Sequence, residues 1–323
     1  MATTVLLGPQ RFMTTAGSTL RALAVDGPVA TITAGWEERE DQDAELNSVL
    51  DGRGRNLRLH HRMFDVLDKD AAFAAAALAF RDRHDELLGF YRLRLQGAME
   101  GVYAVQRRSS AHGTGEAALA DAVEAVRRLD EWYSSQLKGL YRDLDAQAPA
   151  ERSDVIGWHR GELAVALADS AALVITGGHV GTLLRTLRMF ALAIPDALPV
   201  IAWSAGAMAL TSKVVLFHDF APRGSHEVEV FDRGLGRVPG VIALPHARRR
   251  LALDDRARCA VLARRFAEHR LLLLDDGTAA VFDGASAGEG VAGRNGATAA
   301  YGPLPHGVRV LAQTGAVEQV GPA

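Results

Sequence analysis

The stretch PVIAWSAGAMAL, residues 199–210, decides the fold that the sequence predicts. Its apolar first half predicts a buried strand that ends just before Ser204, whereas residues 205–213 predict a helix rich in small residues. A sharp strand-to-helix turn exposes a serine hydroxyl above a sheet and requires small residues two positions before and after it. Ala202 and Gly206 occupy those positions. Ser204 is therefore a candidate nucleophile.

Strands and helices are predicted to alternate on both sides of this turn. The predicted strands are 5–7, 29–33, 57–59, 173–176, 200–203, 228–231 and 241–244, followed by 271–274 and 279–282 as a strand pair near a turn. Such alternation predicts an α/β fold with a mostly parallel sheet that helices flank on both faces. Ligands of such sheets bind at the carboxyl ends of the strands, where Ser204 stands.

One long interruption, residues 62–149, has almost no strand signal. Two apolar stripes with alternating spacings of three and four flank the loop SSAHGTGEA at 109–117, which predicts a long antiparallel helical hairpin inserted into a main domain of residues 1–61 and 150–323. In one interpretation, the stripes pack against each other and the main domain. In the other, part of a stripe forms a homodimer or partner surface.

The composition limits the classes of partner. The chain has 323 residues, 48% of them hydrophobic, and a formal net charge of -3, which predicts neither nucleic-acid binding nor membrane association. One cysteine, Cys259, excludes a disulfide framework and is predicted to pack as a small hydrophobe. The first residues do not resemble a secretory signal. We expect a cytoplasmic protein that acts on a small peptide without metal or organic cofactor.

A serine nucleophile needs a base and donors for the developing oxyanion. His246 follows the predicted strand 241–244 and a proline, and is the candidate base. The stretch ITGGHVG, residues 175–181, ends a strand in two glycines that let the main chain approach a ligand. We pair the N–H of Gly178 with that of Ala205 as the candidate oxyanion hole; an ordinary tight turn is the other interpretation of the glycine pair.

Two carboxylates are candidates for the acid that orients the base. Asp219 follows Ser204 by fifteen residues, and Asp276 follows the predicted strand 271–274; either is alternatively a turn cap. The side chains assigned to substrate binding surround these segments: Gly177, His179, Trp203, Arg223 and Arg248. Arg248 begins a run of three arginines, for which a solvated surface is the stronger interpretation.

Several motifs occur in the order found in the serine peptidase family of dipeptidase E and cyanophycinase. WSAGA at 203–207 is similar to the nucleophile motif of the dipeptidases, and Gly234-Leu235-Gly236 with Pro239-Gly240 resembles the segment before the catalytic histidine. The pair Pro245-His246 then falls where that histidine is expected. The resemblance covers residues 157–282 and implies the flavodoxin-like fold of class I glutamine amidotransferases, with serine replacing their cysteine.

The resemblance implies cleavage of a peptide or isopeptide bond next to an aspartyl residue, through an acyl-enzyme on Ser204 with His246 as the proton shuttle. Asp219 falls where dipeptidases carry an aspartate, and Asp276 where cyanophycinase-like members carry a glutamate. The chain departs from the family pattern at Ala202, where glycine is usual, and at His179, where asparagine, aspartate or a similar polar residue is usual.

Two other functions remain open from the sequence. One is a non-catalytic binding or regulatory protein with an amidotransferase-like fold that assembles through the helical insertion. The other is a tailoring enzyme that transfers the acyl group to an amine in place of water, because a serine acyl-enzyme permits either acceptor.

Overall fold

The computed structural model describes residues 2–110, 112–217, 227–282 and 307–320. Within them, the largest sheet has six strands in the order β10-β1-β5-β4-β2-β3. Their bounds are β10 Ala279–Phe282, β1 Thr4–Leu7, β5 Val200–Trp203, β4 Ala172–Ile175, β2 Val29–Ile32 and β3 Gly54–Asn56. Five of these strands are parallel, and β10 pairs antiparallel with β1. The predicted α/β class with a mostly parallel sheet and flanking helices is thereby confirmed.

Both faces of the centre of this sheet are buried: β1, β5, β4 and β2 are buried at every position rather than at alternate ones, whereas the edge strands β3 and β10 are partly exposed. On β5, Val200 and Ala202 belong to one core cluster, whereas Ile201 and Trp203 belong to another. The first cluster is closed by α3 (Leu59–Lys69), α6 (Asp154–Ala168), α7 (Val180–Met189) and α8 (Ala205–Leu210), and the second by α1 (Ala16–Ala22) and α2 (Ala44–Val49). The ends of the strands are therefore the accessible parts of the sheet.

A second layer of strands follows α8. It contains a four-stranded sheet of order β12-β11-β9-β8 and the antiparallel pair β6-β7. Their bounds are β6 Lys213–Leu216, β7 Glu229–Arg233, β8 Val241–Pro245, β9 Arg270–Leu274, β11 Arg309–Leu311 and β12 Val317–Gln319, with helices α9 Ala247–Arg250 and α10 Arg256–Arg265 between them. Strands β8 and β9 are parallel, so the loops that follow them leave the sheet side by side.

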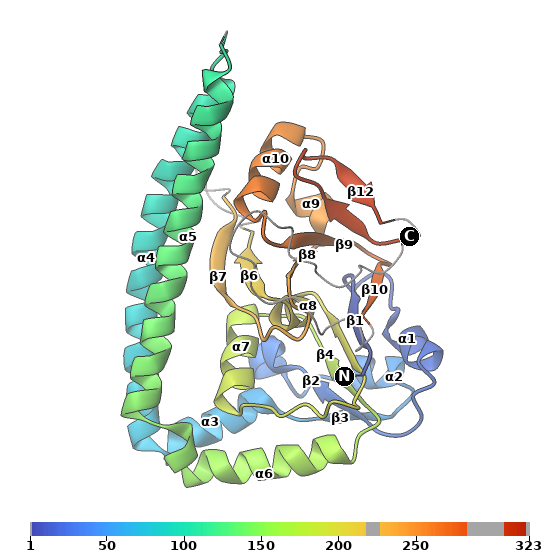
Figure 1. Ribbon diagram of the computed structural model, residues 1–323. Helices are drawn as coiled ribbons and strands as arrows, with labels where there is room; N and C mark the ends of the chain where they lie inside the picture. The colour runs from blue at the N-terminus through green and yellow to red at the C-terminus, as the bar shows by residue number, and fades with distance from the viewer. Residues whose placement is uncertain (1, 111, 218–226, 283–306, 321–323) are drawn as a thin grey trace.

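Two long helices, α4 (Ala71–Arg107) and α5 (Thr114–Gln147), lie antiparallel along one side of the molecule, and their tip projects beyond the rest of the chain (Figure 1). Tyr91 of α4 and Tyr133 of α5 stack with ring centroids 4.3 Å apart and are fully buried. Both stripes join one core cluster with Val230 of β7 and α10. The inward faces of the two stripes therefore pack against each other and against the rest of the chain, as the first interpretation has it. Short 3-10 helices, η1 (Ala34–Arg39) and η2 (Ala150–Arg152), complete the description.

Three local predictions are wrong. The third strand is at 54–56 rather than 57–59, because Leu59 already begins α3. The helix after Ser204 ends at Leu210, and Lys213 begins β6, whose pairing with β7 overrides helix propensity. Strands β9 and β10 do not pair with each other: β9 lies between β8 and β11, whereas β10 covers the outer edge of β1.

Among the helices in the described part of the chain, none combines the length and apolarity that crossing a bilayer requires.

Candidate functional site

Ser204 joins β5 to α8 in a backbone conformation that L-residues rarely adopt. Its φ is 50° and its ψ is −120°, outside the ordinary left-handed region. Such strain costs on the order of 1–3 kcal/mol and persists where the surrounding structure holds it in place. The small residues around Ser204 are needed for this: a methyl group on Gly206 would lie 2.7 Å from the carbonyl oxygen of Thr176. Ser204 itself is half-buried.

The glycine pair after β4 packs directly against this turn. A methyl group on Gly177 would lie 2.9 Å from Cβ of Ser204. Gly178 has a φ of 114°, and a side chain there would collide with the carbonyl of Gly35 in η1. That carbonyl instead accepts a hydrogen bond of 2.6 Å from the N–H of His179. The pair therefore needs glycine for both conformation and space.

Two backbone N–H groups near Ser204 remain available. Ala205 is the first residue of α8, where N–H groups have no acceptor within the helix. For the N–H of Ala205 and that of Gly178, no hydrogen-bond acceptor is found among the described residues. Unused donors at a helix start beside a glycine loop suit a negatively charged ligand atom.

A polar cluster that the sequence analysis did not assign lies at the next strand end. Glu37, in η1 after β2, has a φ of 57° and a ψ of −125°, nearly the conformation of Ser204. Its Oε1 accepts a hydrogen bond of 2.7 Å from the hydroxyl of Thr182 and lies 3.4 Å from Nδ1 of His179. The same Nδ1 accepts from the N–H of Thr182, so His179 caps α7. The ring of His179 is exposed beside the glycine pair.

His246 follows β8 with a φ of 56° and a ψ of 37°, and it is half-buried. Its N–H donates to the carbonyl of Leu274 at the end of β9, 2.9 Å away. The turn after β9 in its turn contacts Gly8 at the end of β1, whose N–H donates to the carbonyl of Thr278 at 2.8 Å. Strand β1 in turn pairs with β5 up to Trp203, the residue before Ser204. The loop of His246 is therefore linked to that of Ser204 through the turn after β9 and the end of β1.

The two aspartates after β9 differ sharply in environment. Asp275 is 9% exposed, accepts from the N–H of Arg248 at 2.9 Å, and pairs with Arg309 at 2.9 Å. Asp276, the residue that the sequence analysis selected, is exposed. Nε of Arg248 lies 3.7 Å from Asp275, which ties this arginine to the turn. Asp219 and Arg223 lie outside the described residues.

Sequence reasoning missed Gly35 and Asp275, and for the run that contains Glu37 it favoured a charged loop over a pocket rim. Gly35 precedes the charged run WEERE without a motif of its own, and its role appears only where it meets Gly178. Asp275 and Asp276 are adjacent in LLLDDG, and the Asp-Gly turn signal favoured the second of the two. Burial alone distinguishes them, and burial depends on the tertiary contacts.

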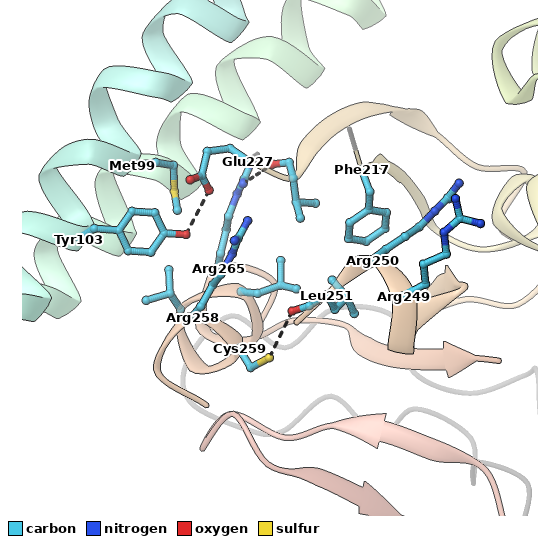
Figure 2. Close-up of a pocket in the computed structure, with 13 residues that line it drawn as sticks. Met99, Tyr103, Phe217, Glu227, Arg249, Arg250, Leu251, Arg258, Cys259 and Arg265 are labelled. Carbon is cyan, nitrogen blue, oxygen red and sulfur yellow. Dashed lines mark hydrogen bonds between the residues drawn. The ribbon is translucent and has the colours of Figure 1, made fainter. Parts of the chain in front are cut away.

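A separate cavity of about 220 Å³ lies between α4, α9 and α10. Figure 2 shows Tyr103 directed toward Glu227, with Arg258 and Arg265 side by side near them; the Tyr103 hydroxyl donates to Glu227 at 3.1 Å. Arg249 and Arg250 also line it, so the arginine run is only partly a solvated surface. Cys259 lies in its wall, where burial raises the pKa of the thiol. A buried thiol of this kind is a poor nucleophile.

One group of side chains places potential metal ligands together. Glu40, His60 and His61 have ligand atoms within 4.8 Å of one another. Glu40 is fully buried, and its two oxygens accept from the N–H groups of His60 at 3.0 Å and His61 at 2.9 Å, at the start of α3. These are the contacts of a helix N-cap, and they explain why the Glu40 carboxylate is buried without invoking a metal ion.

Comparisons with known proteins find a weak structural likeness. No family model matches the chain, and no curated protein does. Among the solved structures that match is one described as "Crystal structure of a peptidase from an acI-B1 Actinobacterium". It is 14% identical, with 88% of this chain and 84% of that chain covered, at a TM-score of 0.38. A likeness of this size carries no conclusion about fold or function.

Proposed function

We propose that this chain is a serine hydrolase that cleaves a peptide or isopeptide bond next to an acidic, aspartyl residue through an acyl-enzyme on Ser204. The observation that carries the proposal is the backbone of Ser204, with φ 50° and ψ −120° at the junction of β5 and α8. A strained residue at the carboxyl end of a parallel strand is typical of a nucleophile elbow. The acidic substrate rests on the resemblance to the dipeptidase E and cyanophycinase family.

The proposed reaction proceeds in two steps. The Ser204 oxygen attacks the scissile carbonyl while His246 accepts its proton, and the N–H groups of Gly178 and Ala205 stabilise the oxyanion. His246 then gives the proton to the leaving amine, and an ester on Ser204 remains. Water attacks this ester with His246 again as the base, which releases the acid and restores the serine. The absence of assigned acceptors for those two N–H groups among the described residues supports this role.

The proposal extends to the architecture. It comprises a glutamine amidotransferase-like domain of residues 1–61 and 150–323, and an inserted hairpin of residues 62–149, in a cytoplasmic protein. The residues assigned to substrate binding are Gly177, His179, Trp203, Arg223 and Arg248. Of these, Trp203 is 7% exposed and belongs to a core cluster, and Arg223 lies outside the described residues. The pairing of Arg248 with Asp275 leaves His179, which is exposed beside the glycine pair, as the better supported contact.

A fluorophosphonate probe followed by peptide mass spectrometry tests the nucleophile without knowledge of the substrate. We expect one adduct, on Ser204, that is absent in Ser204→Ala. Ser170→Ala is the matched control, since Ser170 precedes β4 at the opposite end of the sheet and its hydroxyl donates to the carbonyl of Ala166 at 2.7 Å. An adduct at another serine, or none at all, contradicts the proposal.

Amine release from Asp-Xaa, β-Asp-Xaa and neutral dipeptides tests the substrate. We expect turnover of an aspartyl peptide that falls by several orders of magnitude in Ser204→Ala. An added amine that appears in the product identifies acyl transfer in place of hydrolysis. A labelled Ser204 without turnover of any aspartyl peptide overturns the substrate class and leaves the nucleophile standing.

A further inference from the structure

The outward face of α4, opposite its contacts with α5, carries large apolar side chains that no part of the described chain covers. Leu93 is 68% exposed and Phe90 is 57% exposed. Isolated exposed apolar residues are ordinary, whereas two on adjoining turns of one helix face form a patch. The patch is continuous, because Gly89, Gly97 and the adjoining Gly101 lie on the same face as Leu93 at spacings of four.

The glycines of this face have no explanation within the chain. A methyl group on Gly89, Gly97 or Gly101 would meet nothing within 4 Å, unlike one on Gly178. Each glycine inside a helix costs roughly 0.5–1 kcal/mol relative to alanine. On a free surface alanine is therefore the more stable choice, whereas glycine allows a second helix to approach closely.

The order of residues along α4 is self-complementary for an antiparallel partner. Consider two antiparallel α4 helices that cross at the height of Leu95, whose own side chain points inward. Residues the same number of positions before and after Leu95 then lie opposite each other. Leu93 then faces Gly97 of the other copy, and Gly89 faces Gly101, in both directions. The two Leu93–Gly97 contacts place a large side chain opposite a glycine, and the two Gly89–Gly101 contacts let the backbones approach closely.

The charges along the same face are complementary in this arrangement. Asp82 and Glu86 lie near one end of the patch, and Arg107 and Arg108 lie at the other, all of them exposed. For Glu86, Arg107 and Arg108, no oppositely charged side chain lies within ion-pair distance in the described chain. In the register about Leu95, Asp82 of one copy faces Arg108 of the other, and Glu86 lies one helical turn from the position that faces Arg107. That position is Arg83, which already pairs with Asp143 at 2.8 Å, and the exposed Glu100 faces Phe90. Parallel pairing instead places each of these charges opposite its own copy.

We propose that α4 is the interface of a homodimer in which the α4 helices of two copies pack antiparallel about Leu95. A crossing angle of about 20° keeps both charged ends within reach of long side chains. Another apolar face lies on α6, with Trp158 59% exposed and Val165 63% exposed. There Glu162 already pairs with Arg62 at 3.6 Å and Arg160 with Glu151 at 3.3 Å, so neither charge calls for a second copy. The charges therefore favour α4.

Analytical ultracentrifugation over a wide concentration range measures the assembly. We expect a dimer whose dissociation constant rises at least about tenfold in Leu93→Glu and in Gly97→Leu. Trp158→Glu, on α6, is the matched control and is expected to leave the dissociation constant unchanged. A native protein that is monomeric throughout, or a dimer that Trp158→Glu weakens and Leu93→Glu does not, overturns the proposal.

Charge reversal and cross-linking test the direction of pairing. Glu86→Arg is expected to weaken the dimer, and Arg107→Glu added to it is expected to restore the native dissociation constant. Oxidised mixtures of Leu93→Cys and Gly97→Cys chains should give a disulfide dimer that neither variant forms efficiently alone; native Cys259 is buried and does not compete. A cross-link within Leu93→Cys alone that equals that of the mixture contradicts this register.

The interface and the proposed chemistry are tested separately. Labelling of Ser204 by the fluorophosphonate probe is expected to be the same in Leu93→Glu as in the native protein, because α4 carries none of the proposed site residues. Loss of the dimer with retained labelling supports the interface whatever the substrate proves to be.

Discussion

At the residue scale, two non-glycine residues share one unusual conformation. Ser204 and Glu37 both have φ near 50–57° and ψ near −120 to −125°, and each follows a parallel strand next to β4. Between them lies the glycine pair Gly177–Gly178. Strained residues that cluster at the carboxyl ends of adjacent strands indicate a functional site, because a structure otherwise has no reason to hold the strain.

The first prediction concerns the glycine loop. Gly178→Ala should lower kcat/KM and cost about 1–3 kcal/mol of stability, because φ is 114° and the new methyl group meets the Gly35 carbonyl. Gly236→Ala is the matched control: its φ is 69°, and a methyl group there meets nothing within 4 Å. Kinetics and chemical denaturation of both variants check this. An equal loss of activity in the control contradicts a specific role for Gly178.

The second prediction separates the candidate acids. An orienting acid is expected to be shielded from water, and Asp276 is exposed. Asp276→Asn should therefore retain most of the activity, whereas Asp219→Asn should lose it by orders of magnitude. Steady-state kinetics with an aspartyl dipeptide that the native protein cleaves decides between them. A severe loss in Asp276→Asn, with normal stability, assigns the role to Asp276 instead.

At the element scale, a buried ion pair joins the helical hairpin to the rest of the chain. Arg265 of α10 donates to Asp130 of α5 at 2.6 and 2.7 Å, and the hydroxyl of Tyr91 donates to the same carboxylate at 2.7 Å. Burial lowers the pKa of Arg265, but the adjacent Asp130 outweighs it and the pKa is raised overall. The pair therefore stays charged and ties three helices together.

The third prediction follows from this pair. Asp130→Ala should destabilise the protein by about 3–5 kcal/mol, because it leaves the charge of Arg265 buried and unpaired. Replacing both, as Asp130→Leu with Arg265→Met, should recover much of the loss. Glu131→Ala, at the exposed neighbouring position, is the control and should stay within about 0.5 kcal/mol. Urea denaturation measures all three, and a small effect of Asp130→Ala contradicts the assignment.

At the scale of the whole molecule, partly buried histidines link stability to pH. Burial, with Lys213 and Arg127 nearby, lowers the pKa of His269 to about 4, and burial also lowers the pKa of His84. The unfolded chain binds these protons near pH 6.5, before the folded one does. Stability is therefore fully present above about pH 6.5 and is lost as the pH falls toward 4.

The fourth prediction is that His269→Gln flattens this dependence. Between pH 7 and pH 4.5, the native protein should lose stability more steeply than the variant, by on the order of 2 kcal/mol. Denaturation midpoints measured at several pH values check it. Parallel curves for the two proteins contradict the assigned pKa shift.

The apolar and small-residue pattern of the sequence determined the class of fold and the elbow. The strand 200–203 and the turn at Ser204 appear where the residues predicted them, and the strand predicted at 241–244 extends by one residue to Pro245, because side-chain periodicity and turn chemistry are local properties. Local sequence was enough to suggest both the proposed nucleophile and the proposed base. The distance between them depends on contacts between residues far apart in the chain.

Only the tertiary structure decided which strands pair and which charges are buried. Strands β9 and β10 are adjacent in sequence yet belong to different sheets, because β10 covers the open edge of β1. Asp275 is buried and Asp276 exposed, Gly35 meets Gly178, and the outward face of α4 stays uncovered while its inward face packs on α5 and β7. Each of these depends on contacts between residues far apart in the chain, which no local pattern encodes.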